Sequence, residues 1–168
     1  MDQSSISLIV AVSALLISLV TFYFWNQNRK RSKPEESPFT TRPLQLQAYE
    51  RLVMLAERIA LPNLVSRLNI AGMSAKEMQL LLLESIKQEY EFNATQQIYV
   101  SPVAWEAIRN LKDQNMLIVN QVASAIPPEG TGADLSRRLM EFVMTQKKGV
   151  LHDIVLEALN YEAKKLMR

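Results

Sequence analysis

Hydrophobic and polar positions follow two different patterns along this chain. Residues 6–25 contain no charged side chain, whereas from residue 44 onward apolar residues recur every three or four positions. The first pattern has the length of a membrane-spanning helix, because 20 residues at about 1.5 Å each span about 30 Å. The second pattern is typical of amphipathic helices that bury one face. We therefore predict an all-α chain with a single N-terminal transmembrane helix and a cytoplasmic bundle of about five helices.

The predicted chain has three parts. Residues 1–31 form a transmembrane anchor with a basic juxtamembrane end, residues 32–43 a flexible linker, and residues 44–168 a cytoplasmic helical domain. Proline disfavours helix at the preceding residue, and the linker is rich in it. A cleaved signal peptide is the alternative for residues 6–25. Because no Lys or Arg precedes the apolar run, and bulky aromatics stand at its end where a small-residue cleavage site would be, we favour the retained helix.

Charged and aromatic residues around residues 6–25 indicate an orientation. Basic residues stay on the cytoplasmic side, and here they follow the span rather than precede it. We therefore expect a single-pass inner-membrane protein with its N-terminus outside and its contact with the lipid bilayer made by an aromatic and basic belt. The residues of this predicted membrane interface are Trp25, Tyr23, Arg29, Lys30, Arg31 and Lys33.

Small residues recur along one side of the same span. The steps of three and four residues would let two transmembrane helices pack closely and form a homo-oligomer. The alternative is that the spacing arose by chance, since Ser and Ala are common in single-pass helices, and both interpretations stay open. The possible packing seam consists of Ser7, Ala11, Ala14 and Ser18.

Local signals mark the helices of the domain. Ser74 with Glu77 is a capping box, and Thr131 with Asp134 resembles another. Ser101 is expected to cap the helix that follows it. The predicted helices cover 44–60, about 75–93, 102–125, a segment around 135–148, and about 150–167. We expect residues 63–68 to form a short apolar turn and residues 96–101 an extended connector.

Asn115 interrupts the apolar seam of the predicted 102–125 helix. It is either a buried, hydrogen-bonded residue that fixes register or a residue at the edge of the apolar face. Trp105 and Tyr99 present a similar pair of alternatives, since they form either an exposed aromatic recognition spot or part of the core, and we favour core packing for Trp105.

Composition and charge exclude several function classes. The chain has 168 residues and no cysteine, which excludes disulfides, thiol nucleophiles and zinc–thiolate sites. Four of its 19 basic residues lie between residues 29 and 33, so 15 basic and 16 acidic residues remain from Pro34 onward, a net charge of −1. The domain therefore lacks the excess positive charge of a nucleic-acid-binding protein.

Two groups of polar residues carry candidate chemistry. Glu84, Gln88, Glu89 and Glu91 form an acidic patch, which is either a solvated helix face or a ligand- or metal-binding surface. His152 is the only histidine, so the chain cannot supply the Glu-x-x-His pairs of a di-iron bundle. We favour the solvated face for the patch and a solvated or partly packed side chain for His152, and we expect no catalytic residue, no metal and no cofactor.

Two long stretches resemble a known family. They are LQLQAYERLVMLAERIALPNL (44–64) and MSAKEMQLLLLESIKQEYEFNATQQIYVSPVAWEAI (73–108). They are similar to an uncharacterised bacterial family of small single-pass membrane-anchored helical proteins, a domain of unknown function. The resemblance covers most of residues 44–126. It implies a bacterial origin and the same layout of anchor and helical domain, and it carries no activity.

These observations predict a membrane-tethered protein-interaction or scaffolding module rather than an enzyme. Its partner would be another, unidentified protein or a second copy of the chain. The alternative is a helical bundle that binds a ligand or metal through the acidic patch.

Overall fold

The computed structural model describes Ser18 and residues 20–23, 41–145 and 151–168. Over these residues the structure is helical, as the sequence predicts. The helices of residues 41–168 are α2 (Arg42–Ile59), α3 (Leu61–Leu68), α4 (Ala75–Phe92), the 3₁₀ helix η1 (Ala94–Ile98), α5 (Pro102–Ser124), α6 (Gly132–Thr145) and α7 (Leu151–Leu166).

The prediction of a single-pass membrane protein is contradicted. Among the described residues, no helix is both long enough and apolar enough to cross a bilayer. The physical reason is that the longer helices of residues 41–168 are amphipathic, with charged side chains opposite their buried ones. The same finding contradicts the predicted inner-membrane location with the N-terminus outside. Most of the predicted span at 6–25 lies outside the described residues, of which Ser18 and residues 20–23 are helical and exposed.

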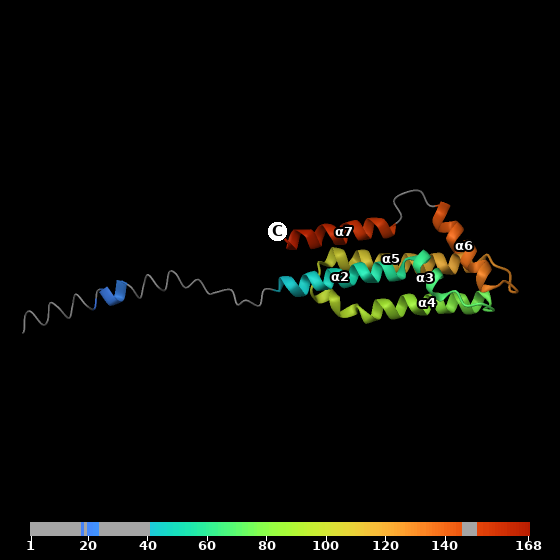
Figure 1. Ribbon diagram of the computed structural model, residues 1–168, viewed down its shortest axis with the longest axis horizontal. Coiled ribbons are helices and arrows are strands. Elements are labelled where there is room, and N and C mark those ends of the chain that lie inside the picture. The colour runs from blue at the N-terminus through green and yellow to red at the C-terminus, as the bar shows by residue number, and fades with distance from the viewer. Residues whose placement is uncertain (1–17, 19, 24–40, 146–150) are drawn as a thin grey trace, which may run out of the picture. The chain divides into compact units, whose positions relative to one another are not determined.

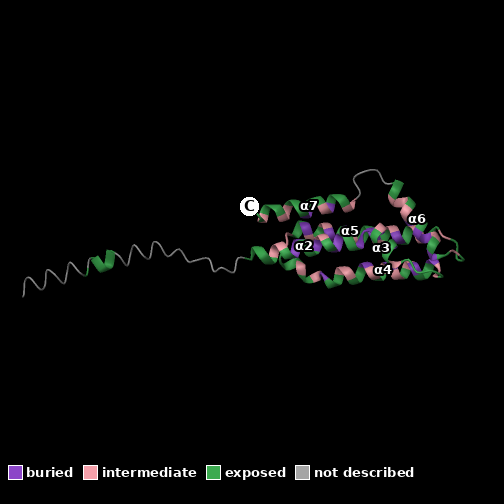
Figure 2. Ribbon diagram, viewed as in Figure 1, coloured by how far each residue is buried: buried purple, intermediate pink, exposed green. Residues whose placement is uncertain are grey.

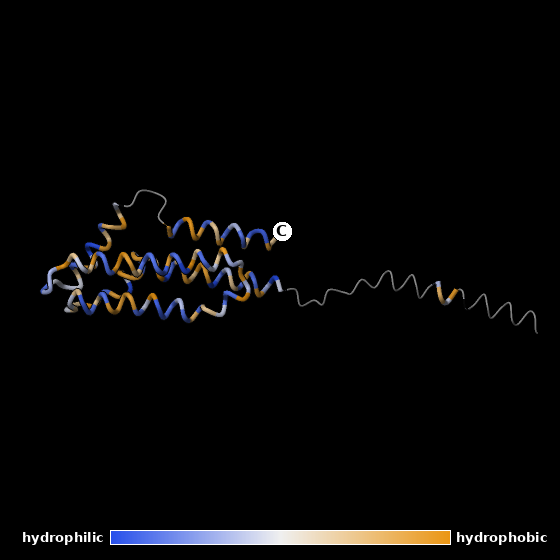
Figure 3. Tube along the Cα trace, turned by 180° about the vertical axis from the view of Figure 1, so that it is seen from behind, coloured by the Kyte–Doolittle hydropathy of each residue, from blue (hydrophilic) through white to orange (hydrophobic). Residues whose placement is uncertain are grey.

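Residues 41–168 form a compact unit by themselves. In Figure 1, α2, α4, α5 and α7 lie lengthwise beside one another, and α6 closes the end of the bundle where it contacts α3 and α4. Their buried faces point toward a common interior (Figure 2), and hydrophobic and hydrophilic residues alternate along each helix (Figure 3). The largest fully buried side chains are Leu52, Leu55, Ile59, Leu64, Met78, Leu82, Ile86, Ile108, Leu111, Leu135, Leu139 and Leu159.

Two segments differ from their predicted conformation. Residues 63–68, expected to be a turn, belong to the helix α3, since Pro62 occupies its first turn, where a missing N–H costs little. The first half of the expected connector at 96–101 belongs instead to the 3₁₀ helix η1, which ends at Ile98. Asn93, at the end of α4, is buried and donates to the carbonyl of Glu89 at 2.9 Å, so the chain continues in a helical turn rather than in extended form.

The N-termini of α4 and α6 are joined through their capping residues. Both predicted capping boxes are formed, with Ser74 bonded to Glu77 and Thr131 bonded to Asp134. Ser74 and Thr131 also pair with each other in an isolated antiparallel bridge. Its hydrogen bonds run from Ala75 N to Gly130 O at 2.9 Å and from the N–H of Gly132 to the carbonyl of Met73 at 2.7 Å. Two separately encoded helix starts therefore form a single backbone junction.

Side chains from other helices satisfy the last carbonyls of α2. Pro62 has no N–H for the carbonyl of Arg58, and Arg67 of α3 donates to this carbonyl at 3.3 Å instead. Asn63 donates to the carbonyl of Glu57 at 2.8 Å. Such replacement is needed because a helix end leaves backbone acceptors without intrahelical partners.

Candidate functional site

A groove opens between α2 and α4, and we call it the α2/α4 groove. It has a volume of about 590 Å³. Its apolar members include Met54 and Phe92, residues that are 60% and 75% exposed. The groove is lined by Arg51, Met54, Leu55, Arg58, Gln88, Glu89, Phe92 and Asn93.

Helical spacing places the α2 residues of this groove on one side. Arg51, Met54, Leu55 and Arg58 are three, four and seven positions apart, so they share one flank of α2. Gln88 and Phe92 are one turn apart on α4 and form the opposite wall. The groove therefore exposes apolar side chains between cationic ones.

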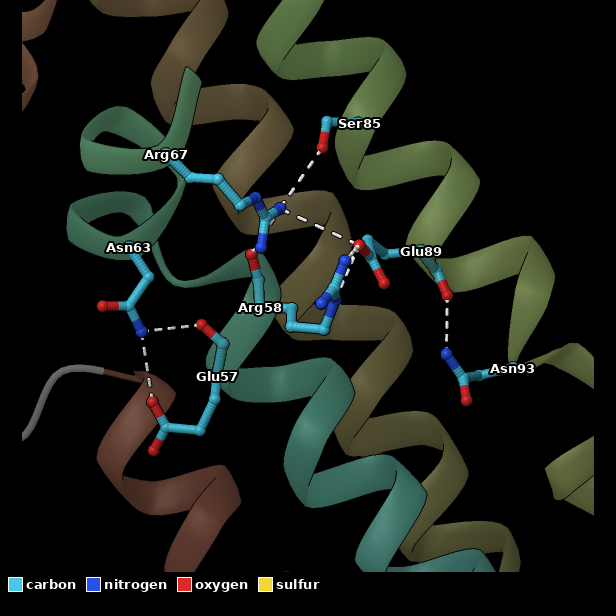
Figure 4. Close-up of polar contacts among 7 residues, drawn as sticks. All are labelled: Glu57, Arg58, Asn63, Arg67, Ser85, Glu89 and Asn93. Carbon is cyan, nitrogen blue, oxygen red and sulfur yellow. Dashed lines mark hydrogen bonds and ion pairs between the residues drawn. The ribbon is translucent and has the colours of Figure 1, made fainter. Parts of the chain in front are cut away.

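A network of two arginines and one carboxylate lies along the groove (Figure 4). Arg58 donates from Nε to Glu89 Oε1 at 2.7 Å and forms an ion pair with the same oxygen. Arg67 approaches that oxygen to 3.8 Å, and it also donates weakly to the hydroxyl of Ser85. The hydrogen bond from Arg58 to Glu89, and their mutual attraction, raise the pKa of the Arg58 guanidinium. Glu89 is thus neutralised by its neighbours, and its side chain is only 15% exposed.

The predicted acidic patch does not form a cluster of free carboxylates. Glu89 faces Arg58, while Glu84 accepts a hydrogen bond from Gln88 at 3.1 Å. Glu91 is exposed. Among the described residues, no three His, Asp or Glu side chains are placed to hold one metal ion. The ligand- or metal-binding alternative therefore gains no support from this geometry.

A second polar cluster joins α7 to the start of α5. The hydroxyls of Tyr49 and Ser101 both donate to Glu162 Oε2, the Ser101 bond at 2.6 Å. Ser101 is also the predicted cap of α5, since its hydroxyl accepts from Ala104 N at 3.1 Å. Burial raises the pKa of the Tyr49 hydroxyl, and its hydrogen bond to Glu162 raises that pKa further. A shallow cavity beside this cluster is lined in part by Lys165.

The remaining sequence candidates lie apart from the groove. His152 points Nε2 toward Glu57 Oε1 at 3.8 Å, while its buried Nδ1 has no hydrogen-bond partner among the residues that the structure describes. Trp105 is partly buried and stacks on Tyr90 with ring centroids 5.1 Å apart, as favoured for core packing. Tyr99 is exposed.

The residues predicted to contact or pack within a membrane are for the most part outside the described chain. Tyr23 and Ser18 are described, and both are helical and exposed. The residues outside the described part are Ser7, Ala11, Ala14, Trp25, Arg29, Lys30, Arg31 and Lys33.

Neither the groove nor the Glu162 cluster is predicted by the sequence. The spacing of Arg51 and Arg58 shows that both lie on one side of α2, but it does not show which helix faces them. No sequence signal links Glu162 to Tyr49, since the two residues are 113 positions apart. Both sites depend on how distant helices pack.

A family model covers residues 3–166, nearly the whole chain, and its description is "Family of unknown function (DUF7935)". The chain belongs to this family. The expected resemblance to an uncharacterised family is confirmed at this level, while the bacterial origin that it implied is not tested. No curated protein and no solved structure matches the chain. The structure therefore shows a helical architecture for this member of DUF7935, and the residues on its surface indicate its function.

Proposed function

We propose that this DUF7935 protein is a non-enzymatic interaction or scaffolding module whose α2/α4 groove receives a helical segment of another protein. The observation that carries the proposal is the exposure of Met54 and Phe92 within a groove walled by two helices. Exposed apolar side chains gathered in a groove and rimmed by polar residues are typical of protein interaction sites. A groove between two helices is also a common receptor for an amphipathic helix.

The residue types in the groove support binding rather than catalysis. Aromatic residues, methionine and arginine are enriched at protein interfaces, and all three are present here. Oε1 of Glu89 accepts a hydrogen bond from Arg58 and forms an ion pair with it, so this carboxylate is engaged in a contact between two helices. Met54 adds an adaptable apolar contact, because its unbranched side chain changes rotamer easily.

Site-specific photo-crosslinking tests this proposal. A photoreactive amino acid is placed at Gln88 in the full chain, which is expressed in the cells that normally produce it. We expect one discrete adduct with another protein, and we expect Phe92→Ser in the same chain to abolish it. The control carries the photoreactive residue at Leu117, an exposed apolar position on α5 outside the groove.

An adduct that forms equally from Gln88 and Leu117, or that persists in Phe92→Ser, would contradict the proposal. Circular dichroism and thermal unfolding of each variant establish that the helical fold is retained, so that a lost adduct reports the groove rather than unfolding.

A further inference from the structure

We infer that the helix received by the α2/α4 groove is acidic and amphipathic, and that Arg51 pairs with one of its carboxylates; this inference rests on the proposed function. The groove walls are chemically asymmetric. They carry the two cations Arg51 and Arg58 and a single carboxylate, Glu89, with Arg67 close by. A complementary occupant presents apolar side chains toward Met54 and Phe92 and negative charge toward the α2 wall.

The other acidic residues of α2 lie away from this wall. Glu57 is hydrogen-bonded to Asn63 and faces His152, on the side of α2 that packs toward α7. Glu50 follows the same flank, because it is seven positions before Glu57. Among neighbouring acids on α4, Glu84 is hydrogen-bonded to Gln88. Neither Glu50 nor Glu57 therefore compensates the positive charge of Arg51 or Arg58.

Arg51 differs from the other arginines of the groove. Arg58 and Arg67 are engaged with Glu89, and Arg67 also donates to the carbonyl of Arg58. Within the described chain, the exposed side chain of Arg51 forms no ion pair or hydrogen bond. An exposed and uncommitted guanidinium can form a bidentate pair with an incoming carboxylate without first breaking another interaction.

The spacing of the cations indicates the form of the occupant. Arg51 and Arg58 are seven residues apart, which corresponds to two helical turns, or about 10 Å. A helix lying along α2 that pairs one carboxylate with Arg51 would place a second carboxylate, seven residues away in its own sequence, near Arg58, which already pairs with Glu89. Its apolar residues, at three- and four-residue spacing, would then meet Met54 and Phe92.

Designed peptides test this inference with the full chain. The probe is a labelled amphipathic peptide of about 18 residues, long enough to form helix when bound, with leucines on one face and glutamates seven residues apart beside them. A second peptide replaces these glutamates with lysines, and a third replaces the leucines with serines. Fluorescence anisotropy measures each Kd. We expect the acidic leucine peptide to bind at least about tenfold more tightly than either of the others.

Charge reversal on the protein locates the interaction. Arg51→Glu should weaken binding of the acidic peptide by about tenfold and strengthen binding of the lysine peptide. The matched control is Lys87→Glu, which makes the same change of charge at an exposed position of α4 outside the groove and should leave both Kd values unchanged. Circular dichroism verifies that both variants retain the fold.

Several results would overturn the inference. They are absence of binding by the acidic leucine peptide, equal binding of glutamate and lysine peptides, and an unchanged Kd in Arg51→Glu. A labelled single-stranded oligonucleotide that binds as tightly as the acidic peptide and loses affinity in Arg51→Glu would also overturn it, because the groove would then select a polyanion. If crosslinking from Gln88 still captures a partner, only the acidic chemistry fails. If that crosslink is absent as well, the proposed function fails.

Discussion

The side-chain amide of Asn115 donates a hydrogen bond of 2.8 Å to the backbone carbonyl of Ile59. Asn115 lies in the middle of α5, and Ile59 is the last residue of α2. Both are buried. The sequence left open whether Asn115 is buried or at the edge of its helix face, and the structure shows that it is buried with a specific acceptor.

Replacing Asn115 with leucine should destabilise the fold. Leucine has a similar size and cannot donate, so the buried carbonyl of Ile59 loses this partner, at an expected cost of about 1–3 kcal/mol in the free energy of unfolding. Chemical denaturation measures the loss. Asn110→Leu, at an exposed position of the same helix, is the control. Equal stabilities of the two variants would show that the Asn115 bond contributes nothing.

A side chain at Gly130 should strain the junction of α4 and α6. A Cβ atom at this position would lie 2.2 Å from Cγ2 of Ile126 and 3.0 Å from the carbonyl oxygen of Pro127. Gly130→Ala should therefore lower the free energy of unfolding by about 1–3 kcal/mol, because the loop must shift while its carbonyl is bonded to Ala75.

A double-mutant cycle with Ile126→Ala identifies the cause of that loss. Ile126→Ala removes the clashing methyl group, so the Gly130→Ala substitution should cost less in the Ile126→Ala background than in the wild type. Additive effects would place the cost in the backbone or at Pro127 instead.

The two capping boxes should make stability depend on acidic pH. The backbone N–H and the hydroxyl of Ser74 lower the pKa of Glu77, and the hydroxyl and N–H of Thr131 lower the pKa of Asp134. A carboxyl with a lowered folded-state pKa stabilises the fold above its unfolded pKa, about 4, and this contribution is lost as pH falls through the lowered value.

Thermal unfolding between pH 7 and pH 3 measures this dependence. We expect the Tm to decrease below about pH 4. The decrease should be less steep in the double variant Glu77→Gln/Asp134→Asn, because neither of its capping boxes contains a carboxyl group that can be protonated. Identical slopes for the variant and the wild type would assign the acid sensitivity to other carboxyls.

Loss of the Tyr49 hydroxyl should loosen α7. Tyr49→Phe removes one of the two hydroxyls that donate to Glu162, at an expected cost of about 1 kcal/mol. Hydrogen exchange should increase in α7, which packs against α2. Tyr161→Phe is the matched control, since Tyr161 is an exposed tyrosine of α7 itself. Equal rates of hydrogen exchange in α7 of Tyr49→Phe and Tyr161→Phe would contradict this role.

The starts of the capped helices proved to be the most predictable feature of the domain. The starts of α4 and α5 follow from Ser74 and Ser101, whose side chains accept hydrogen bonds from backbone N–H groups within the next turn. These signals are local, because the groups that interact lie three residues apart. The helix α3 was missed because Pro62 and Asn63 are equally compatible with a turn, and packing of Leu64 and Val65 in the core favours the helix.

The prediction of a transmembrane fold was wrong. From an uncharged run at residues 6–25 it inferred a spanning helix, an orientation and a location. The helices of the described residues are amphipathic, and none of them could cross a bilayer. The residue pattern of one segment cannot establish the fold or the location of the whole protein, because it contains no information about the rest of the structure.

The amino-acid order alone was sufficient to establish an all-helical domain and the start of each capped helix, because these depend on neighbours a few positions apart. It also established membership of an uncharacterised family, through a match along nearly the whole chain. Packing was needed to place Arg58 against Glu89, Asn115 against Ile59 and Tyr49 against Glu162. Each of these pairs joins residues from different helices. Their proximity arises from burial of many apolar side chains at once, a collective property that no local spacing contains.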